Sequence, residues 1–431
     1  MAAASQARRL RPQLEIVALE RGHWTSYSAC GIPYLVAGDV DEIDQLVARS
    51  PQELRSRFRI DVRLQQEAVG IDVDRRVVEV RDHGHDRTYP LAFDQLMIGT
   101  GARPLRPDLP GIGSDHVRGV QTLEDAAALL EAAKRSRCER VVVVGGGYIG
   151  LEMAEAFHRW GAQVTLVEGS DAVMRTLDPD MSTHIVDAMR DLGIEVRLAE
   201  PVKAFEAGSV VTGSGRLPAD LVVLGLGVTP NAELAGDAGV TLGARGAIEV
   251  DARQRTSVDG VWAAGDCADT WHRVTRRRVH IALGTVANKT ARVAGVNIGG
   301  GYARFPGVVG TAITKICGTE VARSGLTEHE AQMAGFEYAT ATIETTTTAG
   351  YFPSAEKMRI KMLAERGTGR VLGAQIVGGA GSAKRIDTVA TALTAEMDVA
   401  EVLELDLAYA PPFSSVWDPV QAVARKLAPV L

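Results

Sequence analysis

The sequence predicts an α/β protein of several domains, and three observations lead to this fold class. The chain has 431 residues, which at roughly 100–200 residues per domain corresponds to about two to four domains. Glycine contributes 45 residues, which favours folds with many tight turns between strands and helices. Residues 140–168 show a buried strand, a glycine turn, a helix and a second strand, which together form a complete βαβ unit.

Composition and charge narrow the class of protein. Hydrophobic residues make up 46% and charged residues 23% of the chain, as in ordinary globular proteins, so disorder is excluded as the main state. The net charge of −7 argues against nucleic acid or an anionic membrane as the main partner. No apolar run of about 18 residues is present, and the first residues have no signal-peptide core. Four cysteines without a C-x-x-C pair are typical of a reduced chain, and we expect a cytoplasmic protein.

The elements follow in order along three blocks. In the first block we expect a helix, a buried strand ending in an acid, a hairpin and a second buried strand, over residues 1–11, 14–20, 76–81 with 87–90, and 93–104. The second block opens with a helix at 122–135, contains the βαβ unit and closes near 221–231, and a short apolar strand within 259–269 follows it. In the third block we expect strands and then helices, at 338–349, 358–364, 371–377, 381–396 and 415–427.

The strongest local signal is Gly145-x-Gly147-x-x-Gly150, which follows a buried strand and opens a helix. In such a motif the first glycine permits the tight turn, the second lets the backbone approach a pyrophosphate, and the third allows close packing of helix and strand. Glu168 ends the next strand, where its carboxylate can accept a hydrogen bond from a ribose hydroxyl. The motif predicts dinucleotide binding, and a glycine turn that merely packs is the alternative. By the same logic Glu20 holds the ribose of a second dinucleotide, unless it is an ordinary exposed acid.

Cys30 is the candidate reactive residue. It lies in SYSACGIPY, within a turn and helix start, and a cysteine at a helix N-terminus can have a lowered pKa and react as the thiolate. Residue 35 is Leu, so no C-x4-C dithiol exists and Cys30 works alone, or is simply a small buried residue. We interpret Cys138, Cys267 and Cys317 as structural.

Two further features predict no chemistry. His83 and His85 lie at a probable hairpin tip without a third ligand nearby in sequence, so we expect an exposed turn and no metal site. The run of arginines at 276–278 is interpreted as solvated surface.

Together these motifs resemble the pyridine nucleotide–disulfide oxidoreductases, flavoproteins with FAD, NAD(P) and dimerisation domains. TGARP (100–104), GGGYIGLE (145–152), GVTPN (227–231) and TSVDGVWAAGD (256–266) carry the likeness. The resemblance implies two Rossmann-like domains and an α+β C-terminal domain, with boundaries at 1–109 plus 250–317 (FAD), 110–249 (NAD(P)) and 318–431 (dimerisation). It also implies the cofactor-binding residues, which we list as Glu20, Arg21, Thr100, Gly101, Ala102, Gly145, Gly147, Gly150, Glu168, Gly227, Gly265 and Asp266.

The single cysteine in S-x-x-x-C-G-x-P-Y resembles the coenzyme A–disulfide reductase and NADH oxidase group within that family. The segment at 5–10 resembles the helix that contacts coenzyme A, which implies substrate contacts from Gln6, Arg8, Arg9 and Ser26. The segments 350–353 and 409–414 resemble those that reach over the partner subunit's active site. This implies a homodimer with shared sites in which Tyr351 and Tyr409 assist the thiol chemistry; two buried interface tyrosines are the alternative.

The resemblance implies a reaction and leaves its acceptor open. Hydride moves from the nicotinamide to FAD and on to sulfur at Cys30, which then reduces coenzyme A disulfide or a related disulfide or persulfide. The alternatives are an NADH oxidase or peroxidase that uses a cysteine sulfenate, and a non-catalytic flavin sensor of thiol redox state. Ala29 and Trp417 depart from some coenzyme A reductases and resemble relatives that use oxygen, sulfur or persulfides. Glu168 repels a 2′-phosphate, so we expect NADH to be preferred, with NADPH possible.

One part of the family pattern is not in the sequence. The flavin domain of the family opens with a strand, a glycine loop and a helix, whereas here a helical segment leads directly to the strand at 14–20. That first strand is central in the sheet and its loop holds the FAD pyrophosphate. We therefore expect a start roughly 10–15 residues further upstream in the functional chain, and poor flavin retention without that segment.

Overall fold

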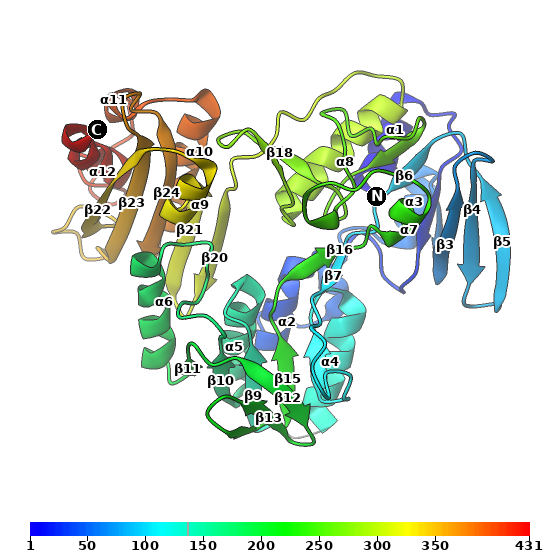
Figure 1. Cartoon of the computed structure of the whole chain (residues 1–431), viewed down its shortest axis with the longest axis horizontal. Coiled ribbons are helices and arrows are strands. Elements are labelled where there is room, and N and C mark those ends of the chain that lie inside the picture. The colour runs from blue at the N-terminus through cyan, green and yellow to red at the C-terminus, as the bar shows by residue number, and fades with distance from the viewer. Residues whose placement is uncertain (136–137) are drawn as a thin grey trace.

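The computed structural model describes residues 1–135 and 138–431. The chain forms three lobes, and the lobe with the C-terminus lies across from the lobe with the N-terminus, with the middle lobe below both (Figure 1). This arrangement is the α/β architecture with an α+β C-terminal domain that the sequence predicts. No helix in the described part of the chain is long and apolar enough to cross a membrane.

The middle lobe is built on a parallel five-stranded sheet in the order β11-β10-β9-β15-β8. Its central strand carries four consecutive buried valines, 141–144, as expected for a parallel strand that is covered on both faces. The elements of this lobe are β8 Val117–Gly119, α4 Leu123–Arg135, β9 Arg140–Val144, α5 Tyr148–Trp160, β10 Gln163–Val167, α6 Pro179–Asp191, β11 Glu195–Arg197, the antiparallel strands β12 Val202–Glu206, β13 Ser209–Thr212 and β14 Arg216–Pro218, and β15 Leu221–Leu224.

The first lobe contains two separate two-stranded parallel sheets, β1-β2 and β17-β6, and an antiparallel sheet β3-β4-β5. Helix α1 lies against helix α8, where a Cβ on Gly295 would come within 2.4 Å of the Ala3 carbonyl oxygen. The elements are α1 Ala2–Leu10, β1 Val17–Glu20, η1 Ala29–Gly31, α2 Ile32–Ala37, η2 Ile43–Leu46, α3 Pro51–Phe58, β2 Asp61–Leu64, β3 Gln66–Asp72, β4 Val77–Asp82, β5 Arg87–Ala92, β6 Leu96–Ile98, β17 Val261–Ala263, β18 Thr270–His272, β19 Arg277–Val279 and α8 Gly284–Ile298.

The split of the first lobe's sheet becomes clear by comparison with the middle lobe. In the middle lobe, β9 pairs with β10 on one side and β15 on the other, and the glycine turn follows it. By the internal duplication, β2-β1 corresponds to β11-β10, and β6-β17 corresponds to β15-β8. Among the described residues no strand pairs with both β1 and β6.

The C-terminal lobe is an antiparallel sheet in the order β20-β21-β24-β23-β22, with helices on one side (Figure 1). Strand β20 belongs to this sheet through its pairing with β21, so the lobe begins before residue 318, the boundary expected from the sequence. Its elements are β20 Ala312–Ile316, β21 Thr319–Gly325, α9 Glu328–Ala334, β22 Tyr338–Thr346, β23 Lys357–Glu365, β24 Val371–Gly378, η4 Ala383–Arg385, α10 Ile386–Ala395, α11 Val399–Leu403, α12 Pro419–Leu427 and η5 Ala428–Val430.

Short antiparallel strands connect the first and middle lobes. The segment 93–104, expected as a buried strand that runs into a glycine turn, forms β6, a turn in which Gly101 has a positive φ of 69°, and a further short strand, β7 Ala102–Pro104. Strand β7 pairs with β16 Val228–Pro230, which follows the middle-lobe sheet. The short elements α7 Glu233–Asp237 and η3 Ala244–Gly246 then lead the chain back to the first lobe.

Candidate functional site

The glycine turn after β9 has the packing that the motif predicts. Gly145 has a φ of 103°, a conformation that only glycine adopts readily. A Cβ on Gly150 would lie 1.9 Å from the Gly145 carbonyl oxygen, so the start of α5 touches the end of β9. The nearest atom to a Cβ on Gly147 would be 3.6 Å away, so the backbone there is open to a ligand. The open backbone N–H groups at the N-terminus of α5 suit a pyrophosphate.

Glu168 lies beside this turn. Its carboxylate accepts hydrogen bonds from the Gly146 N–H at 2.7 Å and from the Ser170 N–H at 2.8 Å and hydroxyl at 2.7 Å. These donors fix the carboxylate against the glycine turn, as the ribose-binding acid of a dinucleotide fold requires.

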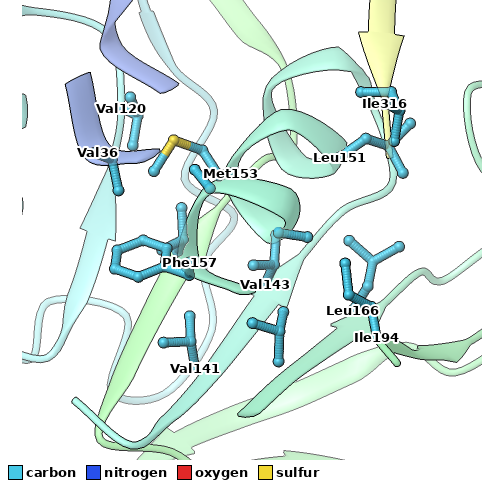
Figure 2. Close-up of a cluster of buried hydrophobic side chains, with 14 of the residues drawn as sticks. Val36, Val120, Val141, Val143, Leu151, Met153, Phe157, Leu166, Ile194 and Ile316 are labelled. Carbon is cyan, nitrogen blue, oxygen red and sulfur yellow. The ribbon is translucent and has the colours of Figure 1, made fainter. Parts of the chain in front are cut away.

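Cys30 sits in the short helix η1, directly before α2, and the residue is exposed. Helix α2 packs on α5, with Val36 close to Met153 and Phe157 in a shared buried cluster (Figure 2). The same cluster contains Leu151 on α5 and Ile316 on β20. Cys30 therefore stands directly before a helix that packs on the nucleotide-binding helix α5 within the middle lobe (Figure 1).

The electrostatics at Cys30 differ from the expected helix-terminal effect. Partial burial and then the carboxylates of Glu152 and Asp266 raise the pKa of the Cys30 thiol. The interpretation that the helix N-terminus lowers this pKa is therefore wrong for the chain without ligands, because two nearby acids and desolvation outweigh one short helix.

Asp266 has an unfilled hydrogen-bonding capacity. Its Oδ1 is buried without a hydrogen-bond partner among the described residues, and burial raises the pKa of its carboxyl. The backbone of the turn is fixed: the His280 Nε2–H donates to the Asp266 carbonyl at 2.7 Å, and the Gly265 N–H donates to Thr290 Oγ1 at 3.3 Å. An orphaned buried carboxylate oxygen on a fixed turn suits a polyhydroxyl ligand such as a ribityl chain. The residues present here fit a flavin.

The expected cofactor residues Thr100–Ala102 and Gly227 come together where the two lobes connect. The Thr100 hydroxyl donates to the Asn231 carbonyl at 2.5 Å, and Asn231 Nδ2 donates to the Thr100 carbonyl at 3.0 Å. The Leu105 N–H donates to the Gly227 carbonyl at 2.9 Å, and Gly227 has a φ of 90°. Hydrogen bonds thus join these two segments into one connection between the first and middle lobes.

Glu20 ends β1, as expected. Its Oε1 accepts from the Gly22 N–H at 2.8 Å, and burial raises the pKa of its carboxyl. Arg21 points away into solvent and pairs with Glu67 at 3.6 Å. Glu20 is therefore placed for a ribose contact, whereas the Arg21 side chain lies at the surface.

The proposed substrate residues on and near α1 are placed differently from one another. Arg8 is 9% exposed, and its guanidinium donates to four backbone carbonyls, those of Phe58, Pro12, Leu14 and Arg59. A direct contact from Arg8 to coenzyme A is contradicted by this placement, because its donors are already bound to the backbone at 12–14 and at 58–59. Arg9 is exposed at the end of the same helix, whereas Gln6 and Ser26 are half-buried.

Tyr351 and Tyr409 lie side by side on the C-terminal lobe. The Ala349 N–H donates to the Pro411 carbonyl at 3.1 Å, which joins their two segments, and desolvation together with the neighbouring Tyr351 raises the pKa of Tyr409. Both rings are exposed, at 77% and 47%. The exposed apolar surface around them, which we call the aromatic face, consists of Tyr351, Tyr409, Phe413, Val416 and Trp417.

The remaining cysteines and histidines have other surroundings. Cys267 is buried, Cys317 lies beside Glu155, and burial raises the pKa of the Cys317 thiol to about 12. His83 and His85 contact different carboxylates, Glu67 and Asp82, each at 3.0 Å, and the two histidines do not converge.

Sequence reasoning missed three groups at the site. Glu152 lies within the GGGYIGLE motif, accepts from the Thr314 hydroxyl at 2.5 Å and has a carboxyl pKa raised by burial. His280 fixes the Asp266 turn. Arg49 approaches Ser5 on α1 at 3.5 Å. The motif letters could have indicated Glu152, but His280 and Arg49 stand in no motif and become visible only in the fold.

Comparison with known proteins identifies the family. The model of the pyridine nucleotide-disulphide oxidoreductase family matches residues 1–291, and the model of its dimerisation domain matches residues 311–420. The curated relatives include a CoA-dependent NAD(P)H sulfur oxidoreductase from Pyrococcus furiosus, which is 39% identical over 99% of this chain and 96% of the relative. An NADH oxidase from Methanocaldococcus jannaschii is 33% identical over 98% of this chain and 95% of its own length.

Solved structures agree with these relatives. The NAD-dependent persulfide reductase from A. fulgidus superimposes with a TM-score of 0.96 at 38% identity, covering 99% of this chain and 80% of that protein. Reduced Bacillus anthracis CoADR-RHD gives a TM-score of 0.97 at 31% identity, covering 100% of this chain and 78% of that protein.

Proposed function

This chain belongs to the pyridine nucleotide-disulphide oxidoreductase family, and we propose that it uses NAD(P)H to reduce coenzyme A disulfide, or a related polysulfide or persulfide, through Cys30. It is a flavoprotein oxidoreductase of the group that includes coenzyme A disulfide reductases. The observation that carries the proposal is the position of Cys30. The residue is exposed and makes no disulfide, and the carboxylates of Glu152 on the nucleotide side and Asp266 on the flavin side influence the pKa of its thiol.

The nucleotide belongs on the glycine turn of the middle lobe. The N–H groups at the start of α5 would hold the pyrophosphate, and Glu168 would accept from the adenosine ribose. A 2′-phosphate would meet the fixed carboxylate of Glu168, and residues 169–174 contain no Lys or Arg. We therefore propose that NADH is preferred to NADPH, which the ratio of the two kcat/KM values measures.

The flavin belongs between the Asp266 turn, Glu20 and the connecting segment at Thr100–Ala102. When bound, FAD would supply two-electron transfer between the nicotinamide and a sulfur atom. Asp266 would bind the ribityl hydroxyls through the oxygen that has no partner in the protein, and Glu20 would bind the adenosine ribose. Both carboxyls are partly desolvated, which strengthens such hydrogen bonds.

Cys30 carries the thiol chemistry in this proposal. Its thiolate attacks one sulfur of coenzyme A disulfide, so that a Cys30–coenzyme A disulfide forms and one coenzyme A thiolate leaves. Two electrons from NADH and one proton then cleave the mixed disulfide, which releases the second coenzyme A thiol and restores the Cys30 thiolate. Burial and the carboxylates of Glu152 and Asp266 raise the pKa of the Cys30 thiol, so a base has to accept the thiol proton before the thiolate attacks.

The coenzyme A pocket would lie along α1. Arg9 presents an exposed guanidinium suited to phosphate groups, with Gln6 and Ser26 nearer the protein interior. Arg8 acts in this proposal as a positioning residue, because it ties α1 to the backbone at 58–59 and 12–14. Arg9→Ala should then raise KM for coenzyme A disulfide without affecting the binding of NADH.

The aromatic face is proposed to cover the site of a second copy. The match to the family's dimerisation domain supports a homodimer, and the exposed rings of Tyr351 and Tyr409 would then meet Cys30 of the partner chain. There the two hydroxyls would protonate or position the leaving thiolate.

An anaerobic assay tests the function and separates the alternatives. NADH consumption and thiol release are followed with FAD present while coenzyme A disulfide, polysulfide, another disulfide or peroxide is offered in turn. The proposal predicts turnover with coenzyme A disulfide or polysulfide, and two thiols released per NADH when the substrate is coenzyme A disulfide. NADH oxidation that requires oxygen would favour the oxidase function that the Methanocaldococcus jannaschii relative's name carries, and absence of multiple turnover would favour a sensor.

A further inference from the structure

The loop between β10 and α6, residues 169–178, lies directly on the glycine turn. The Met174 N–H donates to the Gly146 carbonyl at 2.7 Å, and the Val173 side chain covers Gly146, where a Cβ would come within 2.8 Å of Val173 Cγ1. Near the start of the loop, the backbone N–H and the hydroxyl of Ser170 donate to the Glu168 carboxylate. The loop position thus determines both the glycine turn and the ribose-binding carboxylate.

The far end of this loop is held by the C-terminal lobe. Arg323 on β21 donates to the Thr176 carbonyl at 2.8 Å. Gln375 on β24 makes two hydrogen bonds with Asp178: it accepts from the Asp178 N–H at 2.7 Å and donates to Oδ2 at 2.6 Å. Arg323 is 7% exposed and Gln375 is 1% exposed, so water does not compete for these contacts.

A buried ammonium completes the attachment. Lys361 Nζ on β23 lies 3.1 Å from Asp178 and 2.9 Å from Asp180, and also pairs with Glu328. The three carboxylates converge closely, and the lysine neutralises them at their centre. Removing this charge would leave the buried Asp178 carboxylate unpaired, so Lys361 is a poor residue to mutate alone.

We propose that Arg323 and Gln375 are positioning residues for the nucleotide: by fixing the loop at 169–178 they set the affinity for the adenosine half of NADH. The inference rests on the nucleotide site of the proposed function and goes beyond it, because it assigns part of the nucleotide affinity to the C-terminal lobe. Neither residue contacts the glycine turn or Glu168. Each acts through the loop, and the loop acts through Met174 and Val173.

The test measures binding of ADP-ribose, which carries the adenosine ribose and pyrophosphate of NADH, to the full chain with saturating FAD. Arg323→Met and Gln375→Met are compared with Arg359→Met. Arg359 lies on β23 of the same sheet and also reaches the middle lobe, but it contacts His184 within α6 at 2.6 Å and not the loop. The Glu330 partner of Arg323 is 43% exposed, so water can solvate its carboxylate in the Arg323 variant.

The inference predicts Kd values for ADP-ribose about tenfold higher in the two loop variants, and within about twofold of the parent in Arg359→Met. KM for NADH should rise in parallel while kcat stays close to the parent value. If one loop variant does not fold, as circular dichroism and thermal unfolding show, the other decides the matter. Folded loop variants with unchanged ADP-ribose affinity would overturn the inference.

The outcomes also separate this inference from the proposed function. A parent chain that binds ADP-ribose but reduces no disulfide would contradict only the thiol chemistry, and the loop variants would still decide the inference. A parent chain that does not bind ADP-ribose would overturn both, because no nucleotide would then be positioned.

Discussion

At the scale of single residues, Cys30 shows what a motif conveys and what it does not. Its identity and its position before a helix could be read from SYSACGIPY, and the structure places it there. Its pKa could not be predicted, because it is raised first by burial in the fold and then by two acids, Glu152 and Asp266, that lie far away in sequence. Arg8 shows the same limit: two of its four carbonyl partners are about fifty residues away, at Phe58 and Arg59.

Replacement of Cys30 tests its role against a matched cysteine. Cys30→Ser should retain the fold and the flavin spectrum but lose at least about 100-fold in NADH-dependent disulfide reduction, because the hydroxyl cannot exchange with a disulfide. Cys317→Ser changes a half-buried cysteine beside Glu155 and should keep most of the activity. Disulfide reduction that persists in Cys30→Ser at the parent rate would remove the cysteine from the mechanism.

At the scale of elements, regular patterns were predictable and pairing partners were less so. The buried valines of β9, the glycine turn and helix α5 appear where the sequence predicts them, because a continuous apolar strand followed by that motif has few other solutions. Strand β3 was not predicted. Its burial does not alternate, and its sequence, QEAVGID, does not alternate between apolar and polar residues, so no period of two marks it.

The junction between β18 and β21 leads to a prediction about pH. His272 is 5% exposed, and burial lowers its pKa to about 4, with Glu330 opposing and Arg323 adding to the shift. His272 takes up a proton near pH 6.5 in the unfolded chain but only near pH 4 in the folded protein. Its contribution to the free energy of unfolding is therefore fully present above pH 6.5 and is lost as the pH falls toward 4. The loss contributed by this residue should reach about 3 kcal/mol.

Thermal or urea unfolding between pH 7 and pH 4 checks this contribution. His272→Asn should flatten the pH dependence of the free energy of unfolding, whereas His329→Asn, which changes an exposed histidine, should leave it as in the parent. An equally steep loss of stability in His272→Asn would show that other groups cause it.

At the scale of the whole molecule, the account requires two chains for each site. The aromatic face carries Tyr351 and Tyr409 on the C-terminal lobe, whereas Cys30 lies in η1 directly before helix α2, which packs on α5 of the middle lobe. The family of the chain could be predicted from its motifs because these span almost the whole length. The attachment of the nucleotide loop by Arg323 and Gln375 could not, because it joins residues that are 147 and 197 positions apart.

Hybrid dimers test the shared site. Cys30→Ser and Tyr409→Phe chains with different tags are co-expressed, and the dimer that contains one of each is isolated. If Cys30 of one chain works with Tyr409 of the other, one site in the hybrid is intact, and it should show about half of the parent activity. A hybrid no more active than the two variant homodimers would place both residues in one chain's site.

The most direct test of the central claim asks whether electrons from the nicotinamide reach Cys30. The flavin-loaded chain, oxidised with coenzyme A disulfide, is treated with an alkylating agent before and after anaerobic addition of one equivalent of NADH, and each cysteine is followed by peptide mass spectrometry. The account predicts that Cys30 is blocked before NADH and labelled after it, while the labelling of Cys138, Cys267 and Cys317 does not change. Equal labelling of Cys30 before and after NADH would contradict the account.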